Sequence, residues 1–153
     1  MDASGPGLYG LLARLTLRHD VAEELMQELA LRLLRSPGFA KAADPAAYAA
    51  KSAIHLAMEW RRRRCRQWLS EPTNEPAGGG PSPLESMQRV EDLERVMQAI
   101  GRLRGACQEA FVLRYVEQRS YEQIGRQLGK TEHQVRALCT KAMKRVRKLL
   151  NCT

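Results

Sequence analysis

Aromatic residues are scarce in this sequence, because Phe, Trp and Tyr make up only 5% of its 153 residues. β-Sheets draw on aromatic and β-branched side chains, so a core built mostly from Leu, Ala, Val and Met favours helices. No apolar run approaches the roughly 18 residues that a transmembrane helix needs, and no signal peptide is visible. We therefore expect an all-α protein that stays in the cytoplasm and does not enter a membrane.

The sequence also lacks the patterns that metal sites and catalytic sites require. Its four cysteines form no C-x-x-C pair, and its three histidines stand at no zinc-like spacing to them. No Ser-His-Asp or Cys-His arrangement is apparent. We predict no metal, no cofactor and no enzymatic activity, and free thiols in a reducing compartment.

Positive charge is in excess, and it is unevenly distributed. The net charge is +8, and residues 101–153 account for all of it, with 12 Lys/Arg against four Asp/Glu. A second basic site is the arginine run Arg61, Arg62, Arg63 and Arg64. Nucleic acid is the usual partner for such patches, and an anionic membrane surface is the alternative.

Pro and Gly mark a boundary between two helical domains. Residues 70–86 hold four prolines and three glycines without hydrophobic periodicity, which is typical of a flexible tether. We predict two small domains, at residues 1–69 and 87–153. Periodicity and capping residues predict helices at 8–17, 20–35 and 45–64 in the first domain, and Asp20 is the expected N-cap of the helix at 20–35. In the second domain they predict helices at 87–103, 106–116, 121–128 and 132–150, and the first of these carries Val90, Leu93, Met97 and Ile100 on its apolar face.

Two capping boxes close together indicate a helix-turn-helix in the second domain. Ser120 with Gln123 begins a short helix that ends at Gly129, and Thr131 with Gln134 begins the next helix. Two capped helices joined by a tight turn with a glycine are the geometry that docks a recognition helix in the major groove.

The last helix has one apolar stripe and one polar side. Val135, Leu138, Cys139, Ala142, Val146 and Leu149 share one side, so the opposite side carries His133, Ala137, Thr140 and Lys144. In the first turns of this polar side the side chains are small or of mixed polarity, which suits contacts with base edges. In the later turns they are cationic, which suits phosphates. Three alternatives to a recognition helix remain: an ordinary helical hairpin with a solvated basic face, a helix-turn-helix regulator that binds an operator as a dimer, and a membrane-surface adaptor.

Several segments together resemble bacterial RNA polymerase sigma factors of the extracytoplasmic-function (ECF) group. Residues 120–129 with 135–150 resemble the family's region 4, residues 20–35 resemble its region 2.2 helix, and residues 48–64 resemble the helix that ends region 2 in arginines. The resemblance implies that the chain binds core RNA polymerase, double-stranded promoter DNA and the melted non-template strand. An anti-sigma factor is a further candidate partner.

The resemblance also implies three sets of site residues. The polymerase would bind the polar side of the second helix, at Glu24, Gln27, Glu28, Arg32 and Arg35. The proximal promoter element and its flipped base would meet Phe39, Lys41, Lys51, His55, Arg61, Arg62, Arg63 and Arg64. The distal element would be read by Arg136, then by Glu132, His133, Gln134, Ala137 and Thr140, with Lys141, Lys144 and Arg145 on phosphates.

Overall fold

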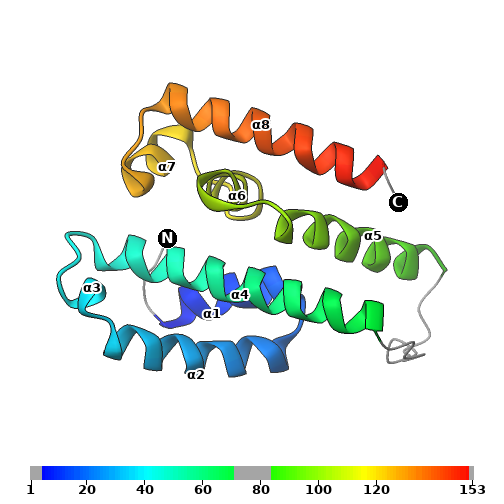
Figure 1. Cartoon of the computed structure of the whole chain (residues 1–153), viewed down its shortest axis with the longest axis horizontal. Helices are drawn as coiled ribbons and strands as arrows, with labels where there is room; N and C mark the ends of the chain where they lie inside the picture. Colours follow the sequence, from blue (N-terminus) through cyan, green and yellow to red (C-terminus); the bar gives the residue numbers. More distant parts are fainter. Residues whose placement is uncertain (1–4, 71–83, 152–153) are drawn as a thin grey trace.

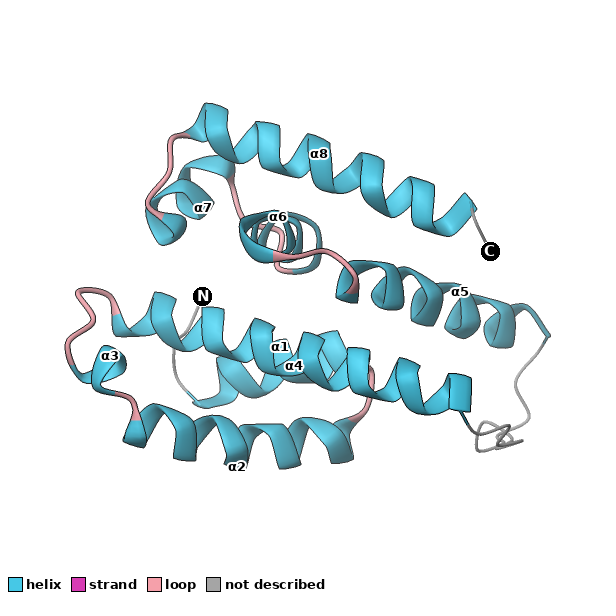
Figure 2. Cartoon of the chain, in the orientation of Figure 1, coloured by secondary structure: helices cyan, strands magenta, loops and turns pink. Residues whose placement is uncertain are grey.

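The computed structural model describes residues 5–70 and 84–151, and in these ranges every regular element is helical (Figures 1 and 2). The first group of helices is α1 (Gly5–Thr16), α2 (His19–Arg35), α3 (Pro37–Ala40) and α4 (Pro45–Ser70). The second group is α5 (Leu84–Gly101), α6 (Gly105–Phe111) continued by a π-helix (Val112–Val116), α7 (Tyr121–Leu128) and α8 (Glu132–Asn151). The all-helical prediction is confirmed.

The core of the N-terminal group lies between α1, α2 and α4. Leu11 and Leu15 of α1 are fully buried, as are Leu29 of α2 and Ile54 and Met58 of α4. The i, i+3/i+4 spacing of these residues places them on one face of each helix, so burying that face brings the three helices together. One prediction here is wrong: Arg18 and not Asp20 is the N-cap of α2, and Asp20 lies in the first turn, where it accepts hydrogen bonds from Arg18.

The segment between α2 and α4, expected to be a loop, contains the short helix α3. Ser36 ends α2, and its hydroxyl oxygen accepts the backbone N–H of Phe39 at 3.3 Å, which caps the new helix. The same hydroxyl lies 2.8 Å from the Tyr48 hydroxyl on α4. A side chain that caps one helix and contacts another therefore fixes the path of this connection.

The core of the C-terminal group lies where α6, α7 and α8 meet. Phe111 and Leu113 are buried against Ile124 of α7 and against Val135 and Val146 of α8. The buried amide of Gln108 donates to the carbonyl oxygens of Ile100 and Leu103, at 3.0 and 2.8 Å, and thereby holds the turn between α5 and α6.

The first turns of α5 depart from expectation. Val90 and Leu93, predicted on the buried face with Met97 and Ile100, are 61% and 45% exposed. Of the predicted tether, residues 71–83 lie outside the described residues, while Ser70 ends α4 and residues 84–86 are already part of α5. In Figure 1, α4 lies between the rest of its own helical group and the helices α5 and α6. Helix α5 packs against α4, and α6 contacts it through Glu109, which reaches Lys51 and His55.

Candidate nucleic-acid interface

Reciprocal capping boxes begin both helices of the helix-turn-helix, as predicted. At α7, the Ser120 hydroxyl accepts from Gln123 N–H and the Gln123 amide oxygen accepts from Ser120 N–H, both at 3.1 Å. At α8, the Thr131 hydroxyl accepts from Gln134 N–H at 3.2 Å and the Gln134 amide oxygen accepts from Thr131 N–H at 3.0 Å. Four backbone N–H groups are thus satisfied locally, and both helix starts are fixed.

The turn between α7 and α8 depends on two glycines for different reasons. Gly129 has φ +67°, the left-handed conformation that ends a helix most readily at glycine. Gly125 lies so close to the turn that a Cβ atom there would be 2.6 Å from the Lys130 carbonyl oxygen. These constraints bring α7 against α8 and set the angle at which α8 is presented.

The predicted faces of α8 are confirmed. Val135, Cys139, Ala142 and Val146 are buried, and the other two members of the predicted stripe, Leu138 and Leu149, are half-buried. The opposite side is solvent-exposed and shallowly hollowed, over a volume of about 550 Å³ lined by His133, Arg136, Ala137, Thr140, Lys141 and Lys144. We call this surface the reading face. Glu132, Gln134 and Arg145 are exposed as well, although the Gln134 amide oxygen is engaged in the cap.

A stacked aromatic ring positions the best candidate for a base contact. The guanidinium of Arg136 lies over the Tyr121 ring of α7, and so does that of Arg114 from the π-helix. Cation–π contacts restrict a long side chain without using its hydrogen-bond donors. The donors of Arg136 therefore stay available on the reading face.

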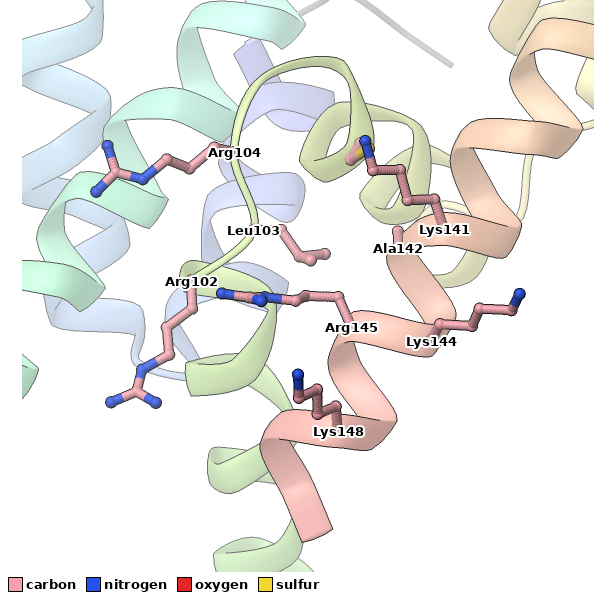
Figure 3. A pocket seen from close by; sticks show the side chains of 9 residues that line it. Arg102, Leu103, Arg104, Lys141, Ala142, Lys144, Arg145 and Lys148 are labelled. Atoms are coloured by element: carbon pink, nitrogen blue, oxygen red, sulfur yellow. The ribbon is translucent and has the colours of Figure 1, made fainter. Parts of the chain in front are cut away.

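A cationic pocket adjoins the reading face (Figure 3). It has a volume of about 550 Å³, and Leu103, Cys107 and Ala142 supply its uncharged lining. The remaining lining residues are cations from α8 and from the α5–α6 turn: Arg102, Arg104, Lys141, Lys144, Arg145 and Lys148. Within the described residues none of the six has an ion-pair partner.

Sequence reasoning missed the contribution of Arg102 and Arg104 to this pocket. Their only sequence signal is two arginines that flank Leu103 just before a helix start. Because Lys141 and Lys144 line both hollows, the reading face and the cationic pocket form one continuous positive surface. Unpaired cations gathered in this way attract a polyanion such as a phosphodiester backbone.

The four arginines of the run in α4 each lie in a different environment. Arg61 is fully buried and donates to the Leu15 carbonyl oxygen and to Glu94 of α5. In this conformation the Arg61 side chain has no contact with solvent, so it could reach a phosphate only if α4 and α5 separate. Burial lowers the pKa of Arg61, and the hydrogen bond to Glu94 opposes that shift.

The other predicted residues of α4 are partly engaged. Arg62 donates to the Gly101 carbonyl oxygen at 3.1 Å, Arg63 pairs with Glu59, and Arg64 lies 5.3 Å from the centroid of the Trp60 ring. Hydrogen bonding from Arg63 lowers the pKa of the Glu59 carboxyl. His55 and Lys51 are exposed by about half, yet both reach Glu109 of α6.

The predicted residues of the α2–α4 connection lie on the outer side of the N-terminal group. Phe39 of α3 is half-buried, with its ring 6.0 Å from that of Tyr48, while Lys41 is exposed. The structure thus places Phe39 and Lys41 at the opposite end of α4 from its arginine run (Figure 1).

One side of α2 combines charged and apolar exposed residues. Glu24, Gln27, Arg32 and Arg35 are exposed, and Glu28 is half-buried and accepts from Arg32 at 2.5 Å. Leu31 and Leu34, which the sequence analysis did not single out, are 53% and 82% exposed. Exposed leucines among paired charges are typical of a protein-binding surface.

Comparison with known proteins identifies the family. The model "Sigma-70 region 2" matches residues 1–67, and the model "Sigma-70, region 4" matches residues 93–146. Both regions expected from the sequence are therefore present, in the expected order. The chain belongs to the sigma-70 family. As a member of its ECF group, this sigma factor binds core RNA polymerase and directs it to promoter DNA, and the polymerase-independent dimeric regulator is not favoured.

Relatives agree with this assignment. The sigma factor is 27% identical over 124 residues to the ferric citrate uptake sigma factor FecI of Escherichia coli strain K12. The aligned region covers 80% of this chain and 72% of FecI. Its fold is similar to that of the sigma factor RpoE solved in complex with the anti-sigma factor NepR from Bartonella quintana, with a TM-score of 0.50, 20% sequence identity, and coverage of 96% of this chain and 91% of that one.

No group of three or more His, Cys, Asp or Glu side chains in residues 5–70 and 84–151 is placed to hold a metal ion. No helix in the same ranges is long and apolar enough to cross a membrane.

Proposed function

We propose that this sigma factor reads the distal promoter element with the reading face of α8 and holds the adjoining DNA strand in the cationic pocket. The observation that carries the proposal is the continuity of the two surfaces through Lys141 and Lys144. A duplex with α8 in its major groove brings phosphates to both sides of the helix. The α5–α6 turn then supplies a second element that holds one strand.

Each residue of this surface has a role that follows from its chemistry. Arg136, held by Tyr121, contacts a guanine edge through its paired donors. Glu132, His133, Gln134, Ala137 and Thr140 border the same bases. Phosphates are bound by the remaining cations, Arg102, Arg104, Lys141, Lys144, Arg145 and Lys148.

The proposed polymerase-binding surface lies on α2, away from the DNA-binding helix α8 (Figure 1). It comprises Glu24, Gln27, Glu28, Arg32 and Arg35, to which the structure adds Leu31 and Leu34. Burying two exposed leucines supplies apolar contact, while the charged residues supply orientation.

The proximal element is the proposed ligand of the N-terminal group. Phe39 and Lys41 would contact the melted non-template strand, where a flipped base needs an apolar wall and a nearby cation. Lys51, His55, Arg62, Arg63 and Arg64 would follow the duplex backbone, and Arg61 would join them only if α4 and α5 separate. The site of action is the cytoplasm, and an anti-sigma factor is a proposed partner, supported by the partner that crystallised with RpoE.

Run-off transcription with purified core polymerase tests the function directly. We expect the wild-type chain to co-purify with core polymerase and to direct transcripts from a library of promoters with two separated elements. L31S/L34S should lose the polymerase in a pull-down, whereas R102A/R104A should keep it and lose promoter affinity. R89A/R95A is the charge-matched control for R102A/R104A, because both of its arginines lie on α5 outside the cationic pocket. Transcripts that do not exceed the core background across the library would contradict the proposal.

A further inference from the structure

Every ion pair between the two helical groups, among the described residues, has its cation on the N-terminal side and its acid on the C-terminal side. Arg61 donates to Glu94 from both terminal guanidinium nitrogens, Nη1 and Nη2, at 2.8 and 3.4 Å. His55 Nε2 lies 2.8 Å from Glu109 Oε1, and Lys51 Nζ lies 3.9 Å from the same oxygen. Arg14 Nη2 lies 2.7 Å from Glu117 Oε1. We call Glu94, Glu109 and Glu117 the acidic triad.

Two members of the acidic triad are withdrawn from water although they are carboxylates. The side chains of Glu109 and Glu117 are 6% and 7% exposed. Buried carboxylates require hydrogen-bonded or charged partners. Within the described residues, the side-chain partners of both come only from the N-terminal group. The C-terminal group therefore depends on the N-terminal group to satisfy these two acids.

The cations that the acidic triad occupies overlap with those proposed for the proximal promoter element. Lys51, His55 and Arg61 meet the triad, and Arg62 donates to the Gly101 carbonyl oxygen of α5. Carboxylate oxygens of the triad and the Gly101 carbonyl oxygen thus occupy the positions at which phosphate oxygens would bind to these cations. The same donors cannot serve a carboxylate and a phosphate at once.

We propose that the acidic triad acts as an internal mimic of DNA phosphates, which keeps the free sigma factor closed and its proximal DNA-binding cations engaged. Proximal promoter DNA, presented in the polymerase complex, competes with the triad for these cations. Opening releases Lys51, His55, Arg61 and Arg62 together, because all four contacts cross the same boundary between α4 and the helices α5 and α6. This inference rests on the proposed DNA role of these four residues.

The experiment compares two variants of the full chain that lose the same charge. E94Q/E109Q removes two acids of the triad. E91Q/D92N removes two exposed acids of α5 that lie outside the boundary between the two helical groups. Small-angle X-ray scattering reports the radius of gyration of each free protein. Titration of a non-specific 20-bp duplex at several salt concentrations reports affinity and the number of phosphates contacted.

We expect E94Q/E109Q to have a larger radius of gyration than the wild type and E91Q/D92N. Its DNA affinity should exceed that of E91Q/D92N by on the order of tenfold, and its salt slope should be steeper by about three, one for each phosphate contacted by Lys51, Arg61 and Arg62. Adding K51Q/R62Q to E94Q/E109Q should remove about two of these three. Circular dichroism checks that E94Q/E109Q retains the helix content of the wild type. If it does not, the scattering measurement is made on E109Q, and on the wild type at increasing salt concentration.

Two results would overturn the inference. An unchanged radius of gyration in E94Q/E109Q and E109Q would show that the triad does not hold the chain closed. An increased radius with a salt slope equal to that of E91Q/D92N would show that the contact is structural and does not cover DNA-binding cations. A separate pull-down with core polymerase keeps these results distinct from a failure of the sigma-factor function, since polymerase binding is proposed for α2.

Discussion

The guanidinium carbon of Arg136 lies 4.9 Å from the centroid of the Tyr121 ring, and that of Arg114 lies 4.3 Å from it. Tyr121 is the first residue of α7, directly after the Ser120 cap, so the capping box that begins α7 also positions the ring. The capping box that starts α7 thus controls the α8 side chain, Arg136, that we propose as the reader of the distal element.

Arg136→Ala should change sequence preference, because a guanidinium contacts one or two base pairs. We expect discrimination there to fall by about 1–3 kcal/mol, measured as binding of a holoenzyme to single-base-pair variants of the distal element. Tyr121→Leu should weaken discrimination at the same base pairs by about 0.5–1 kcal/mol, the value of an exposed cation–π contact.

Lys144→Ala is the matched control on the same face. An ammonium that binds phosphate carries no sequence information, so this variant should weaken binding to all promoter variants alike and reduce the salt slope by about one. If the Arg136 and Lys144 variants behave identically, the division of α8 into base-reading and phosphate-binding turns is wrong.

Gly125→Ala should destabilise the helix-turn-helix. Its new methyl group would lie 2.6 Å from the Lys130 carbonyl oxygen, which is backbone and cannot rotate away. We expect the free energy of unfolding to fall by about 1–3 kcal/mol, as for other overpacked sites, measured by urea denaturation. Gly10→Ala in α1 is the control, because the nearest atom to its Cβ, at 3.1 Å, is the end of the flexible Arg14 side chain; alanine there should leave stability unchanged or raise it. Equal effects of the two substitutions would refute this account of the turn.

What the sequence could predict depended on whether the determining contacts were local. The two capping boxes involve residues three positions apart, and the buried stripe of α8 follows from helix periodicity alone, so both were predicted correctly. The contacts that decide which arginine of the run is buried are not local in sequence. Successive helix residues are rotated by about 100°, so one of four consecutive arginines had to face inward, but only the packing of α4 against α1 and α5 decides that it is Arg61. The same limit applies to the cationic pocket, since Arg102 and Lys148 are brought together only by the fold.

Arg61→Met should lower the free energy of unfolding by about 1–3 kcal/mol. Methionine keeps the apolar stem in a site that is 0% exposed, but the Leu15 carbonyl oxygen and Glu94 lose their donor. Arg63→Met, two residues further along α4, removes only an exposed ion pair with Glu59 and should change stability by less than about 0.5 kcal/mol. Chemical denaturation of both variants measures the difference; similar stabilities would mean that the buried guanidinium contributes no net stabilisation.

Cys139 should be chemically inert in the folded protein. Burial raises the pKa of its thiol, and the sulfur contacts the Ala110 carbonyl oxygen at 3.8 Å. A raised pKa lowers the thiolate fraction at neutral pH, and the thiolate is the reactive form. We expect iodoacetamide at neutral pH to leave Cys139 unmodified while the half-buried Cys65 and Cys107 react first, as followed by peptide mass spectrometry. In urea all three should react at similar rates, since unfolding removes the burial that protects Cys139. Fast alkylation of native Cys139, or its oxidation ahead of Cys107, would instead show that α8 separates from α6 often enough to expose its buried stripe, and the rigid presentation of the reading face would have to be abandoned.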